Sequence, residues 1–113
     1  MANALIDVQN TFLTLDSQYN MLLAACQTAA DRDALAAQYS KAQQNYQAAL
    51  NAVLSDDDAE VAALSTQLKA ANTQVLQATS QMGNISKVIN DIVTAVSIGV
   101  KLISMAAPGP VQL

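Results

Sequence analysis

The strongest structural signal lies in residues 61–106, which read VAALSTQLKAANTQVLQATSQMGNISKVINDIVTAVSIGVKLISMA. Alternate steps of three and four residues along this stretch meet only apolar side chains or glycine. A seam sustained over about six heptads is typical of a helix that packs along a partner helix. The seam positions are Val61, Leu64, Leu68, Ala71, Val75, Ala78, Met82, Ile85, Ile89, Ile92, Val96, Gly99, Ile103 and Ala106.

The first half of the chain carries two shorter seams of the same kind. One comprises Leu5, Val8, Phe12, Leu15, Tyr19, Leu22, Cys26 and Ala29, and the other comprises Leu35, Tyr39, Ala42, Tyr46, Ala49 and Val53. The two runs are out of step by one residue, and the slip falls at residues 31–33. Because no glycine or proline lies there, a local change of helical winding is favoured over a loop.

The seam of the second half keeps its phase across Gly83. The acidic stretch at residues 55–60 is the clearest turn signal before the C-terminal prolines, and it has the spacing of a helix-capping box.

We therefore expect an all-α protein, an antiparallel hairpin of two long coiled-coil-like helices at about residues 4–54 and 57–106. A four-helix bundle with breaks near residues 31 and 83 is the alternative. Residues 1–107 are expected to form a single helical domain, and residues 108–113 a flexible Pro/Gly tail.

The charge of the chain is low and acidic, with a net charge of −4 and 12% charged residues. The basic residues are spread singly along the sequence, at Arg32, Lys41, Lys69, Lys87 and Lys101. A nucleic-acid surface needs clustered Lys and Arg, so nucleic acid is not expected as a partner. Residues 1–7 lack the basic and apolar regions of a signal peptide. We expect a cytoplasmic protein, or one exported by a leaderless route.

The sequence offers little for catalysis. It contains no histidine, and Cys26 is the one cysteine, so a thiol nucleophile would lack an imidazole base. The acidic run at residues 56–58 lacks the glycine and the distal glutamate of an EF-hand calcium loop. We therefore expect no enzyme activity, no cofactor and no metal site.

The positions that flank the long seam change character along the chain. They are polar in its first half, as at Ser65, Asn72 and Thr79, and apolar in its second half. A wide apolar face needs more than one partner helix, so the second half is expected to carry an interaction surface. The first segment adds off-seam apolar residues such as Ile6, Leu13 and Met21. The predicted surface consists of Val88, Ile89, Ile92, Val93, Val96, Val100, Leu102 and Ile103.

These features predict a non-enzymatic interaction or assembly protein that oligomerises, or binds another helical protein, through the apolar open end of the hairpin. A small membrane-active helical protein, such as a toxin or pore component, is the alternative. A partner-neutralising module, such as an immunity protein or chaperone, is a further one. The apolar stretch at residues 92–107 contains Lys101 and is shorter than the ~20 residues of a bilayer span, so a stable transmembrane anchor is not expected.

Overall fold

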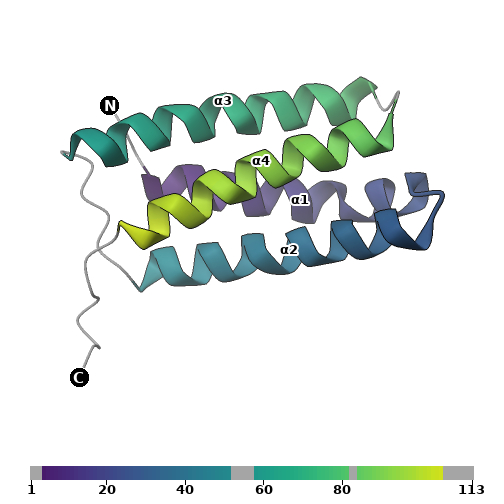
Figure 1. Cartoon of the computed structure of the whole chain (residues 1–113), viewed down its shortest axis with the longest axis horizontal. Helices are drawn as coiled ribbons and strands as arrows, with labels where there is room; N and C mark the ends of the chain where they lie inside the picture. Colours follow the sequence, from purple (N-terminus) through teal and green to yellow (C-terminus); the bar gives the residue numbers. More distant parts are fainter. Residues whose placement is uncertain (1–3, 52–57, 82–83, 106–113) are drawn as a thin grey trace.

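The computed structural model describes residues 4–51, 58–81 and 84–105, and it is helical almost throughout them. The helices are α1 (Ala4–Ala25), α2 (Ala29–Leu50), α3 (Ala59–Gln81) and α4 (Ile85–Ser104). They pack side by side as a bundle (Figure 1). The all-α class is thus confirmed. Of the two arrangements considered, the structure has the four-helix bundle, and the two long continuous helices are not formed.

The first break lies at residues 26–28, a few residues before the slip in the seam. Thr28 has an extended backbone, and its side-chain oxygen accepts a hydrogen bond from the Asp31 backbone N–H at 3.1 Å. This is an N-cap, which satisfies one of the free donors at the start of α2. The slip therefore marks a new helix rather than a change of winding, and the Thr28–Asp31 spacing was the missed signal.

The second break separates α3, which ends at Gln81, from α4. The Asn84 side chain accepts hydrogen bonds from the backbone N–H groups of Ser86 and Lys87 at 3.0 and 3.3 Å, and so it caps α4. A continuous helix over residues 57–106 is therefore wrong, although the seam keeps its phase. Gly83, which was expected inside that helix, lies outside the described residues.

The start of α3 is capped by the acidic stretch, as expected. Asp58 Oδ1 accepts from the backbone N–H groups of Glu60 and Val61 at 2.8 and 3.2 Å. A carboxylate is also favoured there by the positive end of the helix dipole. Residues 55–57 of this stretch lie outside the described residues.

The helices form two antiparallel pairs, α1 with α2 and α3 with α4 (Figure 1). The pairs stack so that α1 lies against α3 and α2 against α4, and in both of these contacts the helices run parallel (Figure 1). α1 also touches α4 across the bundle, whereas no contact joins the described parts of α2 and α3. The α1–α3 and α2–α4 sides are consequently opposite faces of the bundle.

The core follows the predicted seams. The largest fully buried apolar side chains are Leu15, Leu22, Leu35, Leu68, Ile92, Leu102, Val8, Val88 and Val96. The aromatic residues of the chain, one Phe and three Tyr, all come from α1 and α2. Phe12 stacks on Tyr46 with ring centroids 5.8 Å apart, and Tyr19 lies 4.7 Å from Tyr39. The α1–α2 pair thus adds ring contacts to its buried leucines, whereas the described part of the α3–α4 pair packs through aliphatic side chains.

Candidate functional site

Most of the predicted interaction surface lies inside the bundle. Five of its eight residues are buried within the chain: Val88, Ile89, Ile92, Val96 and Leu102. Ile103 is half-buried against them. Val93 and Val100 remain exposed, at 37% and 47%. The wide apolar face of α4 is therefore largely covered by the other helices of the same chain.

The two columns beside the seam exchange roles between α3 and α4. In α3 the buried column is the polar one, which consists of Ser65, Asn72 and Thr79. Continued by heptads, that column reaches Val93 and Val100, which are exposed, while α4 buries the opposite column of Val88, Ala95 and Leu102. The exchange is geometrical. The helices α3 and α4 run in opposite directions, and both pack against the layer formed by α1 and α2. Viewed from N- to C-terminus of each helix, the column that faces this layer therefore lies on one side of the seam in α3 and on the other side in α4.

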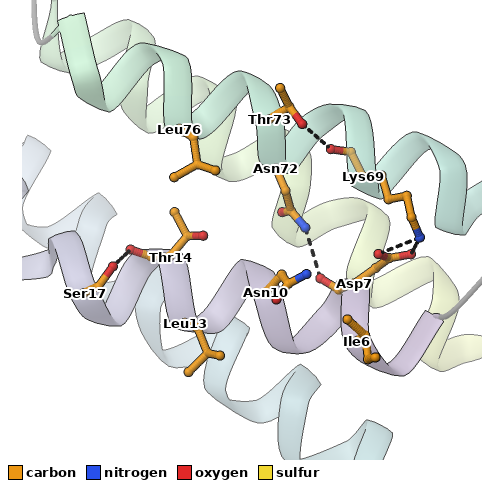
Figure 2. Close-up of a pocket in the computed structure, with 10 residues that line it drawn as sticks. All are labelled: Ile6, Asp7, Asn10, Leu13, Thr14, Ser17, Lys69, Asn72, Thr73 and Leu76. Carbon is orange, nitrogen blue, oxygen red and sulfur yellow. Dashed lines mark hydrogen bonds and ion pairs between the residues drawn. The ribbon is translucent and has the colours of Figure 1, made fainter.

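Asp7 is the centre of a polar network between α1 and α3, and its side chain is only 2% exposed. Its carboxylate accepts a hydrogen bond from the Ser65 hydroxyl, and Lys69 Nζ lies 3.0 Å from both carboxylate oxygens. The Asn72 amide donates to the Asp7 backbone carbonyl at 3.0 Å, as Figure 2 shows. Thr11 donates to Asn72 Oδ1 at 2.7 Å. These contacts join residues about 60 positions apart in parallel register.

The charges of this network are compensated, and its polar atoms have hydrogen-bond partners. The Lys69 charge compensates that of Asp7, and in the described part of the chain no buried side-chain nitrogen or oxygen lacks a hydrogen-bond partner. Lys69 itself is half-exposed, so its charge keeps contact with water. A buried carboxylate with this set of donors is typical of a structural pairing that fixes which helices meet. Sequence reasoning missed Asp7, although it is a polar residue beside the apolar seam of α1.

An open groove of about 740 Å³ lies over this network, between α1 and α3. Ile6, Leu13 and Leu76 line it and are 46%, 45% and 50% exposed. Figure 2 shows Ile6 and Leu13 on α1 and Leu76 on α3. Apart from the Asp7–Lys69 pair, the remaining lining residues are uncharged: Asn10, Thr14, Ser17, Asn72 and Thr73. Ile6 and Leu13 belong to the off-seam apolar positions noted in the sequence.

A second, smaller groove of about 340 Å³ lies on the opposite face, between α2 and α4. The exposed Val93 and Val100 line it together with Lys41 and Lys101. Beneath it, Asn45 of α2 donates to the Val96 backbone carbonyl at 3.3 Å. The remaining lining residues are Gln38, Val96 and Ser97.

The Asn45 side chain rests on Gly99, where a Cβ atom would lie 2.9 Å from Asn45 Nδ2. Ala95 and Gly99, both buried, are two small residues about one helical turn apart on α4. They lie on the face of α4 that packs within the bundle, where small side chains let neighbouring helices approach closely.

The described residues offer little reactive chemistry. Among them, no group of three or more His, Cys, Asp or Glu side chains is placed to hold a metal ion. Cys26 is buried, and its Sγ lies 3.3 Å from the Leu22 carbonyl oxygen, to which it donates. Burial, helped by the nearby Asp31 carboxylate, raises the pKa of the Cys26 thiol and keeps it protonated. The expectation that the chain is not an enzyme stays a prediction.

Comparison with protein-family models, with curated proteins and with solved structures finds no match to this chain. Among the described helices, none combines the length and the hydropathy needed to cross a membrane.

Proposed function

We propose that this chain is a non-enzymatic interaction protein that associates with a second copy of itself through the α1–α3 groove. One observation carries the proposal. Three large apolar side chains, Ile6, Leu13 and Leu76, each about half exposed, line the same groove on neighbouring parallel helices. Single exposed apolar residues are ordinary on protein surfaces, but a cluster in a groove is typical of a contact site.

The charge of the groove, unlike that of the whole chain, is compatible with a second copy as the occupant. Two molecules that each carry a net charge of −4 repel one another over most orientations. The α1–α3 groove is lined by one cation and one anion, Lys69 and Asp7, which neutralise each other. Two such grooves can meet without like-charge repulsion while they bury their apolar side chains.

The parallel register of α1 and α3 suits a twofold contact. Thr11 bonds to Asn72, so Leu13 and Leu76 lie within about one helical turn of the same level. A twofold axis along the helices would place α1 of one copy over α3 of the other. Leu13 would then meet Leu76 of the second copy twice, which is the self-complementary contact that a symmetric dimer requires.

Sedimentation velocity over a concentration series tests the proposal. We expect a concentration-dependent dimer for the wild-type chain. The double change Leu13→Ser and Leu76→Ser should raise the dissociation constant at least about tenfold, because it removes apolar area from both sides of the contact. Far-UV circular dichroism should stay helical, since both side chains are half exposed in the monomer.

The matched control is the double change Met21→Ser and Leu50→Ser. These side chains are 45% and 56% exposed and do not line the groove. The control should dimerise like the wild type. A wild-type chain that stays monomeric at millimolar concentration, or a control that weakens the dimer as much as the groove variant, would count against this function.

A further inference from the structure

The α2–α4 groove carries an apolar pair between two lysines. Val93 and Val100 are one heptad apart on α4, which is about 10 Å along the helix axis. Lys41 on α2 and Lys101 on α4 line the same groove, and both are exposed. Among the residues that the structure describes, no carboxylate lines this groove.

The positive charge at this groove runs against the acidic character of the chain. Of the five basic residues, Lys69 pairs with Asp7 and Lys87 pairs with Asp91. Neither Lys41 nor Lys101 is in an ion pair with any residue that the structure describes. In a chain of net charge −4, two cations without an ion-pair partner among the described residues therefore line one groove.

The shape of the groove fits a single helix better than a lipid surface. Its walls are parallel helices whose distance is set by the Asn45–Gly99 contact. A helix docked in such a groove uses apolar side chains at heptad spacing, and Val93 and Val100 have that spacing. Ser97, which stands between the two valines on α4, and Gln38 of α2 line the same groove. A membrane-surface helix needs a broad apolar face, which two valines do not provide.

We propose that the α2–α4 groove binds an acidic amphipathic helix of a different protein. Its apolar side chains, one heptad apart, would cover Val93 and Val100, and its carboxylates would flank them and pair with Lys41 and Lys101. The contact lies on the face opposite the α1–α3 groove, so it does not depend on self-association. The chain would then join a copy of itself on one face and an acidic partner on the other.

Fluorescence anisotropy with labelled model peptides tests this contact. The first probe is a helical peptide with leucines one heptad apart, flanked by glutamates. The second has lysines in place of the glutamates, and the third has serines in place of the leucines. We expect binding of the first peptide alone, weakened by added salt because exposed ion pairs are screened. Equal binding of the glutamate and lysine peptides would overturn the proposal.

Two variants locate the binding on the protein. Lys41→Gln with Lys101→Gln should weaken binding of the glutamate peptide by up to about tenfold at low salt. Val93→Ser with Val100→Ser should weaken it about tenfold at any salt concentration, because these side chains supply the apolar contact. The controls are Arg32→Gln, which removes a positive charge from α2 outside the groove, and Leu50→Ser. Both controls should bind like the wild type, and a loss in a control equal to the loss in its groove variant would overturn the assignment.

The same measurements are repeated in the Leu13→Ser/Leu76→Ser background. Peptide binding that is unchanged in this background shows that the α2–α4 contact is independent of the proposed self-association. Either proposal can then fail without the other. Co-sedimentation with phosphatidylcholine–phosphatidylserine vesicles completes the test. Vesicle binding that depends on Lys41, Lys101, Val93 and Val100, without binding of the glutamate peptide, would identify a lipid surface as the occupant and overturn the proposal.

Discussion

The two parallel helix pairs of this bundle are joined in different ways. Between α1 and α3 the contact is polar, centred on a buried carboxylate with donors from Ser65 and Lys69. Between α2 and α4 the contact is a close approach, in which Asn45 rests on Gly99. A shift of α1 by one turn against α3 would strip Asp7 of its donors, so the polar contact selects one register. The α2–α4 contact selects its register by shape, because only glycine leaves room for the Asn45 side chain.

The largest expected effect comes from breaking the polar pair. Asp7→Ala should lower the free energy of unfolding by about 2 to 3 kcal/mol, because the buried Ser65 hydroxyl loses its acceptor and Lys69 its counter-ion. The half-exposed position of Lys69 keeps the loss below that of a fully buried ion pair. Urea denaturation followed by circular dichroism measures it. Asp33→Ala, which removes an exposed carboxylate from α2, is the control and should change stability by less than about 0.5 kcal/mol.

The contact between α2 and α4 is tested by a double-mutant cycle on Gly99 and Asn45. Gly99→Ala gains about 1 kcal/mol of helix propensity, but its Cβ displaces Asn45 from the 3.3 Å hydrogen bond to Val96. The single variant should therefore stay within about 0.5 kcal/mol of the wild type. In an Asn45→Ala background the same change should stabilise by up to about 1 kcal/mol. Equal stabilisation in both backgrounds would show that the two side chains are not coupled.

The smallest expected effect is on the titration of Tyr39, which lies at the contact between α1 and α2. Tyr39 donates a 2.6 Å hydrogen bond to Asp16, and this bond to the carboxylate raises the pKa of Tyr39 above the ordinary value of a tyrosine. The pKa of Tyr39 is higher in the folded than in the unfolded state. The contribution of the Tyr39–Asp16 hydrogen bond to stability is therefore complete below the unfolded-state pKa, and it is lost as the pH rises through the folded-state pKa. Absorbance titration at 295 nm should show a late step that is absent in Tyr39→Phe. A Tyr39→Phe curve that keeps this late step would contradict the contact.

Much of the fold could be predicted from periodicity. The seam residues Val61, Leu68, Ile92 and Val96 are buried as expected. The breaks were harder to place. Between α3 and α4 the heptad phase stays intact, and between α1 and α2 the slip of one residue is equally compatible with a change of winding. Thr28 and Asn84 are the capping residues at the two breaks.

The surface could be predicted only in part. Periodicity shows that α4 has two apolar columns beside its seam, but not which of them faces the second layer. Which column faces the second layer depends on how the α1–α2 pair stacks on the α3–α4 pair. In the observed stacking Val88 is buried and Val93 is exposed. The α1–α3 network also escaped prediction, because Asp7 pairs with residues about 60 positions away in the chain.

The most direct test of the proposed self-association is a dilution series followed by two-dimensional ¹H–¹⁵N NMR. If two copies meet through the α1–α3 groove, the amide signals that move with concentration will cluster at Ile6, Asn10, Leu13, Thr73 and Leu76. Signals near Val93 and Val100, on the opposite face, will stay in place. Shifts that gather at Val93 and Val100 instead, or a spectrum that does not change up to millimolar concentration, would contradict it.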